Sequence, residues 1–215
     1  MIEKVNNQTL GEEIANAVTH GLGTLLAIAA TVVAIVYACF VSDALGVVSA
    51  SIYGFTLTLM YINSTIYHSL ANNKAKRVYR ILDHCSIFLL IFGTYTPIAL
   101  SLIRGWLGWT VFGVLLTLTV LGVVFNSINL KKWEKASLVL YIIMGWMAIF
   151  ILKPIYEETG IGGMFYLVLG GLFYTVGIIF YKLKIKYMHP LWHLFVIGGS
   201  IFHYFFVLFY ALPIK

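Results

Sequence analysis

Apolar residues occupy most of this chain in long runs, and short polar stretches separate the runs. Residues 25–40 and 111–125, for example, are almost entirely apolar. A helix of roughly 20 apolar residues crosses the ~30 Å hydrocarbon core of a bilayer. We therefore predict an all-α, polytopic membrane protein, a bundle of seven transmembrane helices. The expected helices cover residues 14–40, 45–70, 81–103, 109–130, 135–153, 161–182 and 189–212.

Several local signals refine these boundaries. Thr9 and Glu12 have the spacing of a capping box, which begins a helix by satisfying its free N–H groups. Pro97 predicts a kink, because proline removes a backbone hydrogen bond. Residues 72–80 are polar and basic, and we expect them to form a loop. The chain is expected to be a single membrane domain, 1–215, in which 1–13 form a short cytoplasmic segment.

Composition supports this class and excludes others. The 215 residues are 61% apolar and only 10% charged, whereas soluble domains contain about 25% charged residues. The net charge of +6 does not indicate a nucleic-acid partner, because the basic residues lie in short loops and not on one face or arm. We expect a multi-pass protein of the cell membrane whose partners are membrane lipids.

The distribution of basic residues predicts the orientation. Lysine and arginine favour cytoplasmic loops. With the N-terminus inside and seven crossings, the C-terminus lies outside, and six or eight crossings would spoil the charge alternation. Eleven of the 14 basic residues then face the cytoplasm: Lys4, Lys74, Lys76, Arg77, Arg80, Lys131, Lys132, Lys135, Lys182, Lys184 and Lys186. The outer side holds Arg104, Lys153 and Lys215.

Five of the six histidines fall at similar depths near the cytoplasmic ends of the expected helices. At 1.5 Å per residue, they lie about 5–10 Å inside the boundary. These residues are His20, His68, His84, His189 and His193, and Asp83 shares their layer. Ionisable groups are costly in lipid and need a shared partner. Neutral imidazoles bind zinc well, so we predict a Zn²⁺ site.

The spacing adds detail and leaves alternatives open. His189 and His193 are four residues apart, on one helix face, and Ser64 lies one turn before His68, where it could bond the other ring nitrogen. Each residue also has a structural interpretation: Asp83 as a helix cap or a partner of Arg80, and His20 and His84 as packing residues. We expect His203, about 25 Å from the cytoplasmic boundary, to be a buried histidine bonded to a neighbouring helix.

These motifs together resemble the hemolysin III family, the prokaryotic branch of the progestin and adipoQ receptor (PAQR) superfamily. The similarity covers nearly the whole chain, and its motifs occur in the family's order. They are Glu12-Glu13-Ile14-Ala15-Asn16, Thr19-His20-Gly21, Ser64-xxx-His68, Leu82-Asp83-His84 and His189-xxx-His193-Leu194-Phe195.

The resemblance implies roles for individual residues. It implies that His68, His189 and His193 bind zinc, that Asp83 holds or activates a zinc-bound water, and that Ser64 belongs to the site. We place His20, His84 and Tyr67 as candidate surrounding residues.

Two classes of function follow. The first is a zinc-dependent hydrolase of lipid amide or ester bonds, similar to ceramidases. The second is a non-enzymatic regulator or sensor of the membrane with a structural zinc. A cytolytic pore is less favoured, because the sequence shows no row of charged or polar residues across the membrane.

Overall fold

The computed structural model describes residues 8–213, and every regular element in this range is a helix. The α-helices are α1 (Leu10–Val41), α2 (Ala44–Ser69), α3 (Lys74–Pro97), α4 (Gly105–Gly145), α5 (Leu152–Lys182) and α6 (Met188–Phe206). Shorter π- or 3₁₀-helical stretches extend them at Ile98–Ile103, Trp146–Ile151 and Val207–Ala211. Five continuous helical segments in the described range are long and apolar enough to cross a membrane, which confirms the all-α membrane class.

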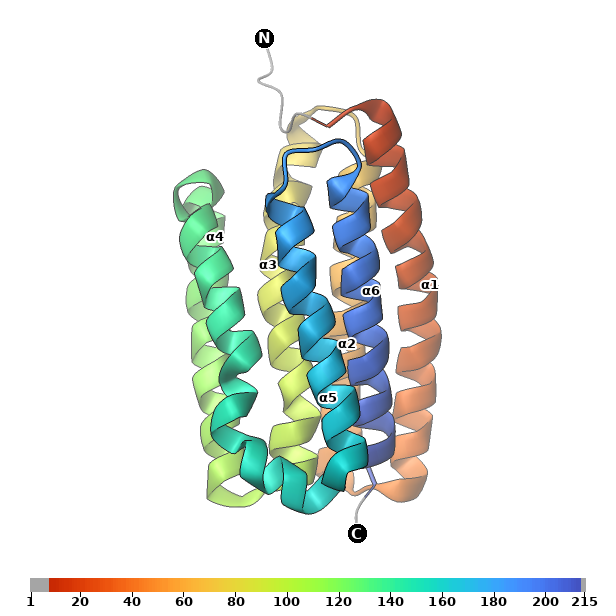
Figure 1. The fold of residues 1–215 in the computed structure, drawn as a ribbon, viewed down its shortest axis with the longest axis vertical. Helices are drawn as coiled ribbons and strands as arrows, with labels where there is room; N and C mark the ends of the chain where they lie inside the picture. Colours follow the sequence, from red (N-terminus) through yellow and green to blue (C-terminus); the bar gives the residue numbers. More distant parts are fainter. Residues whose placement is uncertain (1–7, 214–215) are drawn as a thin grey trace.

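Two breaks interrupt the segment Gly105–Lys182. Asn129 in α4 has φ −159° and ψ 89°, and Gly160 in α5 has φ 61°. A positive φ is readily adopted by glycine, which carries no Cβ. Figure 1 shows α4 running to one end of the bundle, reversing there and returning. Both breaks lie within one residue of the predicted boundaries 130 and 161.

The beginnings of two helices differ from the prediction. The capping box at Thr9 is present, so α1 begins at Leu10 and not at residue 14. The predicted loop at 72–80 is wrong, because Asn73 caps α3 by accepting a hydrogen bond from the Lys76 N–H at 3.0 Å. Basic residues therefore extend this helix beyond its apolar part. Hydrophobic runs locate the part of a helix that lies in lipid, and caps decide where the backbone begins to coil.

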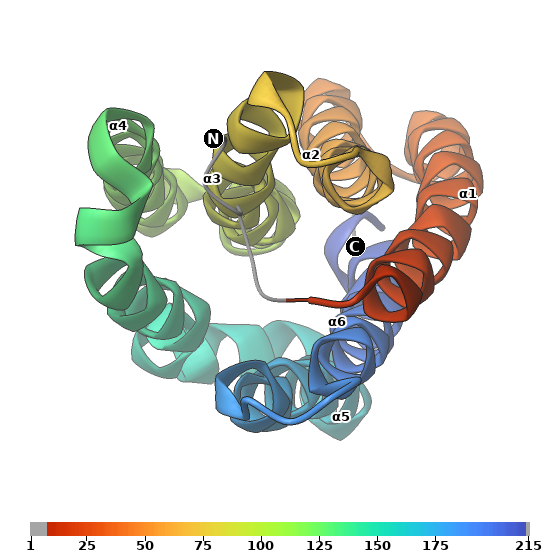
Figure 2. The ribbon, with the colours of Figure 1, turned by 90° about the horizontal axis from the view of Figure 1, so that it is seen from above.

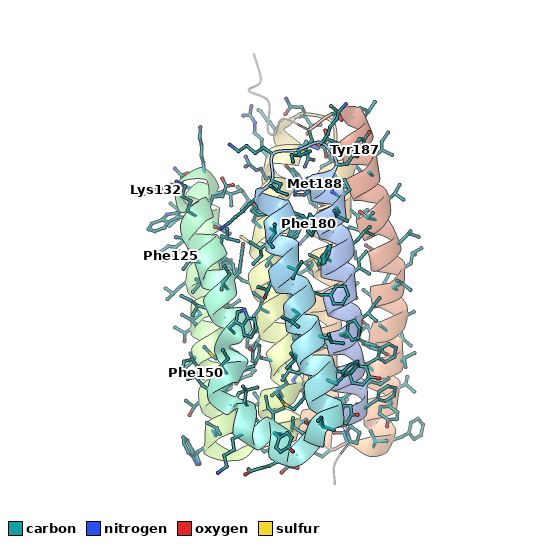
Figure 3. The ribbon with its side chains drawn as sticks, in the orientation of Figure 1. Phe125, Lys132, Phe150, Phe180, Tyr187 and Met188 are labelled. Atoms are coloured by element: carbon teal, nitrogen blue, oxygen red, sulfur yellow. The ribbon has the colours of Figure 1, made fainter. Side chains whose placement is uncertain are left out.

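The arrangement of the helices places α1 beside both α2 and α6. In Figure 2 the elements follow one another around a ring, and α6 closes it next to α1. The start of α1 lies at the same end of the bundle as the α2–α3 and α5–α6 turns (Figure 1). Figure 3 shows Lys132 and Tyr187 toward this end and Phe150 in the opposite half. Lys4 and Lys215, used in the charge argument, lie outside the described residues.

Candidate metal centre

Three histidines converge where α2 ends and α6 begins. His68 comes from the last turn of α2, and His189 and His193 come from the first turns of α6. One ring nitrogen from each lies within 4.8 Å of the others. The ring centroid of His68 lies 5.2 Å from the ring centroid of His189 and 5.2 Å from that of His193. The structure thus brings together the three residues that the sequence suggested as metal ligands.

The Nε2 atoms of these three histidines are buried and have no hydrogen-bond partner. A buried polar atom without a partner costs about 1–3 kcal/mol. One nitrogen from each ring lies close enough to the others to hold a metal ion, and three imidazoles are a donor set that zinc accepts. The residues present therefore fit a Zn²⁺ ion.

Contacts on the opposite ring nitrogens fix the tautomers of His68 and His193. His68 Nδ1 lies 2.7 Å from the Glu13 carboxylate, which can only accept, so Nδ1 carries the proton. The amide nitrogen of Asn16 also approaches this Nδ1, but at 3.3 Å, and the shorter contact to a charged group decides the tautomer. His193 Nδ1 lies 3.2 Å from Thr19 Oγ1. Since the Thr19 hydroxyl donates to backbone carbonyls of α1, it accepts from His193.

Glu13 is itself held by a buried lysine. Lys76 Nζ lies 2.9 Å from the second oxygen of Glu13. It also donates to the backbone carbonyls of Tyr67 and Leu70, at 3.0 and 3.1 Å. These carbonyls belong to the last turn of α2, where helix carbonyls lack partners within the helix. The Lys76 ammonium therefore joins the end of α2 to the start of α1.

Sequence reasoning missed Glu13 and Lys76, although a signal was available. Glu13, Asn16 and His20 recur at helical spacing, and Asn16 and His20 are buried on the inner face of α1. Polar residues on the inward face of a membrane helix indicate partners inside the bundle. The predicted start at residue 14 hid this pattern, because it left Glu13 outside the helix.

Ser64 is buried in α2, one turn before His68. The expected hydrogen bond from Ser64 to His68 is wrong, since Glu13 and Asn16 contact Nδ1 and Nε2 has no partner. The ring of Tyr67 lies 4.5 Å from that of His68, and the Lys76 ammonium lies 4.8 Å from the same tyrosine ring. Tyr67 thus packs directly behind the first histidine.

Asp83 and His84 occupy neighbouring positions on α3. Asp83 Oδ2 lies 3.7 Å from His84 Nδ1, which also contacts the Arg80 carbonyl at 2.8 Å. Because α3 begins at Lys74, Asp83 lies well inside the helix, and the alternative that it caps α3 is wrong. Its carboxylate is not part of the three-histidine cluster. Arg80 meets His84 through its backbone and, among the described residues, forms no ion pair with Asp83.

His20 extends the cluster into the bundle. Its ring stacks on His193 with centroids 3.5 Å apart and lies edge-to-face with Tyr61 with centroids 5.0 Å apart. The Tyr61 hydroxyl donates to Ser200 Oγ at 2.8 Å, and Tyr174 contacts the same oxygen at 2.8 Å. Sequence analysis overlooked this row of polar groups, because tyrosine and serine do not interrupt an apolar run.

The predicted bond of His203 to a neighbouring helix is confirmed, and the residue is half-buried. Its Nε2 contacts the Leu167 carbonyl of α5 at 3.1 Å. The residue lies one helix turn beyond Ser200 and makes no ring contact with the other histidines of the described chain.

A groove of about 650 Å³ opens at the surface beside the cluster. Glu13, His68 and Lys76 line its polar part, and Ile14, Val18 and other residues of α1 line its apolar part. Ile14 and Val18 are also exposed on the outer face of α1. The groove therefore extends from the exposed outer face of α1 to His68.

Comparison with known proteins agrees with this architecture. The chain is 44% identical to "Hemolysin-3" of Bacillus cereus over 99% of both chains. It is 42% identical to "Hemolysin-3 homolog" of Bacillus subtilis, over 96% of this chain and 97% of the relative. It is also 25% identical to "Monocyte to macrophage differentiation factor" of Homo sapiens, over 92% of this chain and 83% of the relative. The sequence profile described as Haemolysin-III related matches residues 8–204, and the chain belongs to this family of integral membrane proteins.

Proposed function

We propose that this protein is a zinc-dependent hydrolase of lipid amide or ester bonds, with its site near the cytoplasmic face of the cell membrane. The observation that carries the proposal is the set of three buried Nε2 atoms without partners. Contacts to Glu13 and Thr19 fix the metal-binding tautomer of two of the three rings. Three histidine ligands leave a fourth position for water or substrate.

The proposed topology has seven crossings, with the N-terminus in the cytoplasm and the C-terminus outside. The breaks at Asn129 and Gly160 support it, because they divide the longest apolar segment into legs that can cross separately. Single cysteines at Lys132 and Glu157, in a background without Cys39 and Cys85, provide a test. A membrane-impermeant thiol reagent added to intact cells should label position 157 and spare position 132. Labelling of position 132 would overturn the proposed orientation.

The chain's residues have distinct roles in this proposal. His68, His189 and His193 would hold the ion, which lowers the pKa of water toward about 7 and polarises a carbonyl. Asp83 would take the proton of the attacking water as general base. Its position outside the histidine cluster supports a role through water over a role as ligand. Ser64 and Tyr67 are candidates to hydrogen-bond the substrate oxygen, and His20 and His84 would pack against the ligands.

The substrate class follows from the surroundings of the site. The cluster lies in a membrane bundle, and the neighbouring groove has an apolar wall that continues onto the outer face of α1. A lipid can present its acyl chain to the apolar wall and its polar linkage to the site. Membrane lipids are therefore the proposed partners.

The test combines metal content with hydrolysis. Purified protein should contain about one zinc per chain by mass spectrometry, and it should release fatty acid from a panel of lipid amides and esters. Metal-loaded protein that hydrolyses none of them would contradict the enzymatic proposal. Protein without zinc, after preparation free of chelators, would contradict the metal site.

One observation favours a second candidate, a regulator or sensor with a structural zinc. The ligand nitrogens are all buried, and His20 stacks on His193, so a metal there would join α2 to α6. The Co²⁺-substituted protein separates the two candidates. Azide should change its visible spectrum if a coordination position is open to exchange, and it should leave a closed structural site unchanged.

A further inference from the structure

Glu13 connects the histidine cluster to the start of α1 through both of its carboxylate oxygens. One oxygen lies 2.7 Å from His68 Nδ1, and the other lies 2.9 Å from Lys76 Nζ. Nothing in the proposed reaction requires a charge at this position. The carboxylate instead lies behind a ligand, where it controls the orientation of the ring.

Lys76 explains why the Glu13 carboxylate is held in one position. An ammonium group has three N–H donors, and Lys76 has three acceptors: Glu13 and the carbonyls of Tyr67 and Leu70. The lysine is 3% exposed. Burial of a charge is tolerated when its partners satisfy it. The first turn of α3 therefore holds one oxygen of Glu13 and leaves the other for His68.

We propose that Glu13 is a positioning residue for the metal ligand His68 and that Lys76 holds Glu13 in place. This inference rests on the proposed zinc site and deepens it. A carboxylate that accepts from one ring nitrogen fixes the tautomer, orients the ring and makes the other nitrogen a stronger ligand. Loss of such a partner typically weakens metal affinity by about 10–100-fold.

The test compares zinc affinity across four full-length proteins: wild type, Glu13→Gln, Glu12→Gln and Glu13→Gln/Lys76→Met. Glu12 is the matched control, since it is a neighbouring carboxylate on the same helix whose contacts are with Thr9 and the Tyr187 N–H. Glutamine also serves in a capping box. In Glu13→Gln the Lys76 ammonium faces a neutral amide in place of a carboxylate. The double variant removes this ammonium as well.

Zinc dissociation constants come from competition with a chromophoric chelator, and the visible spectrum of the Co²⁺ form reports ligand geometry. We expect Glu13→Gln to weaken zinc binding about 10–100-fold and to alter the Co²⁺ spectrum, and we expect the double variant to do the same. Glu12→Gln should keep the wild-type affinity and spectrum. Thermal unfolding of the metal-free proteins shows whether each variant is folded.

Three results would overturn the inference. Wild-type affinity and spectrum in Glu13→Gln would show that the carboxylate does not position the ligand, while the zinc site itself would stand. Equal losses in Glu12→Gln and Glu13→Gln would show a general loosening of α1. Wild-type protein that binds neither zinc nor Co²⁺ would overturn both this inference and the proposed function.

Discussion

The two ends of the helix bundle differ in the burial of their polar side chains and in the partners of those side chains. At the histidine end, the rings of His20, His68 and His193 are buried and several of their nitrogens lack partners. At the opposite end, Asp43 and Arg104 form a 2.7 Å ion pair whose side chains are 42% and 36% exposed. Asp43 also caps α2 through the Gly46 N–H. Figure 1 shows that α1 links the two ends.

This difference separates a site from a structural contact. The Asp43–Arg104 pair joins two turns, and both side chains remain partly exposed. The Nε2 atoms of His68, His189 and His193 are buried without partners, which carries a cost of about 1–3 kcal/mol for each such atom. Such a cost persists in a protein when a ligand repays it. We therefore expect changes at the histidine end to alter metal binding, and changes at the other end to alter stability.

The largest expected effect comes from His189→Ala. Removal of one of three ligands should abolish the stoichiometric zinc, measured by mass spectrometry. His203→Ala is the matched control on the same helix, because the ring of His203 contacts the Leu167 carbonyl and lies outside the three-histidine cluster. That variant should retain zinc and unfold at a lower temperature. Equal zinc loss in both variants would break the comparison between metal ligands and packing histidines.

Asp83→Asn should have the next largest effect. The amide cannot accept a proton at neutral pH, so hydrolysis should fall by about 10²–10⁴-fold, the range of general-base catalysis. Zinc content should stay at the wild-type level, because Asp83 is outside the ligand cluster. Asp43→Asn is the control carboxylate at the opposite end and should retain activity. Zinc loss in Asp83→Asn would instead make Asp83 a ligand.

Gly108→Ala tests packing at the end that lacks the histidines. A Cβ at Gly108 would collide with the Ala99 carbonyl oxygen, which is backbone and cannot rotate away. Overpacking typically costs about 1–3 kcal/mol, so the variant should unfold at a lower temperature in detergent while its zinc content is unchanged. Gly113→Ala on the same helix meets nothing within 4 Å and should not be destabilised. Similar unfolding temperatures for the two variants would contradict this packing.

The smallest effect concerns acid stability. The hydrogen bond from Arg104, with the Gly46 N–H, lowers the pKa of Asp43 below its usual 3.8. A lowered pKa in the folded state stabilises the protein above the usual value, and that stabilisation is lost as pH falls through the lowered pKa. Thermal unfolding between about pH 6 and pH 3 should therefore show a slightly weaker acid dependence in Asp43→Asn. Because the pair is exposed, the difference should be small. An unchanged pH profile would show that the pair contributes nothing.

Most of the helical architecture could be predicted, since apolar runs long enough for a bilayer have few alternatives to a helix. Where the prediction failed, the cause was local. The cap at Asn73 extends α3 through residues for which charge alone predicts a loop. In the same way, the capping box at Thr9 placed Glu13 inside α1. A side-chain cap can begin a helix among charged residues that stay exposed, so charge alone does not mark where a helix begins.

By itself the sequence pattern determined the membrane class and placed five of the six histidines at similar depth, whereas the resemblance to the hemolysin III family singled out His68, His189 and His193. The membrane class depends on hydrophobicity, and the expected depth depends on the fixed rise of a helix. Only the tertiary structure decided which residue contacts Nδ1 of each ring. Glu13, and not Ser64, contacts Nδ1 of His68, and Thr19 contacts Nδ1 of His193. The reason is physical, because hydrogen bonds between α1, α2 and α6 depend on helix rotation and packing, which a linear pattern does not specify.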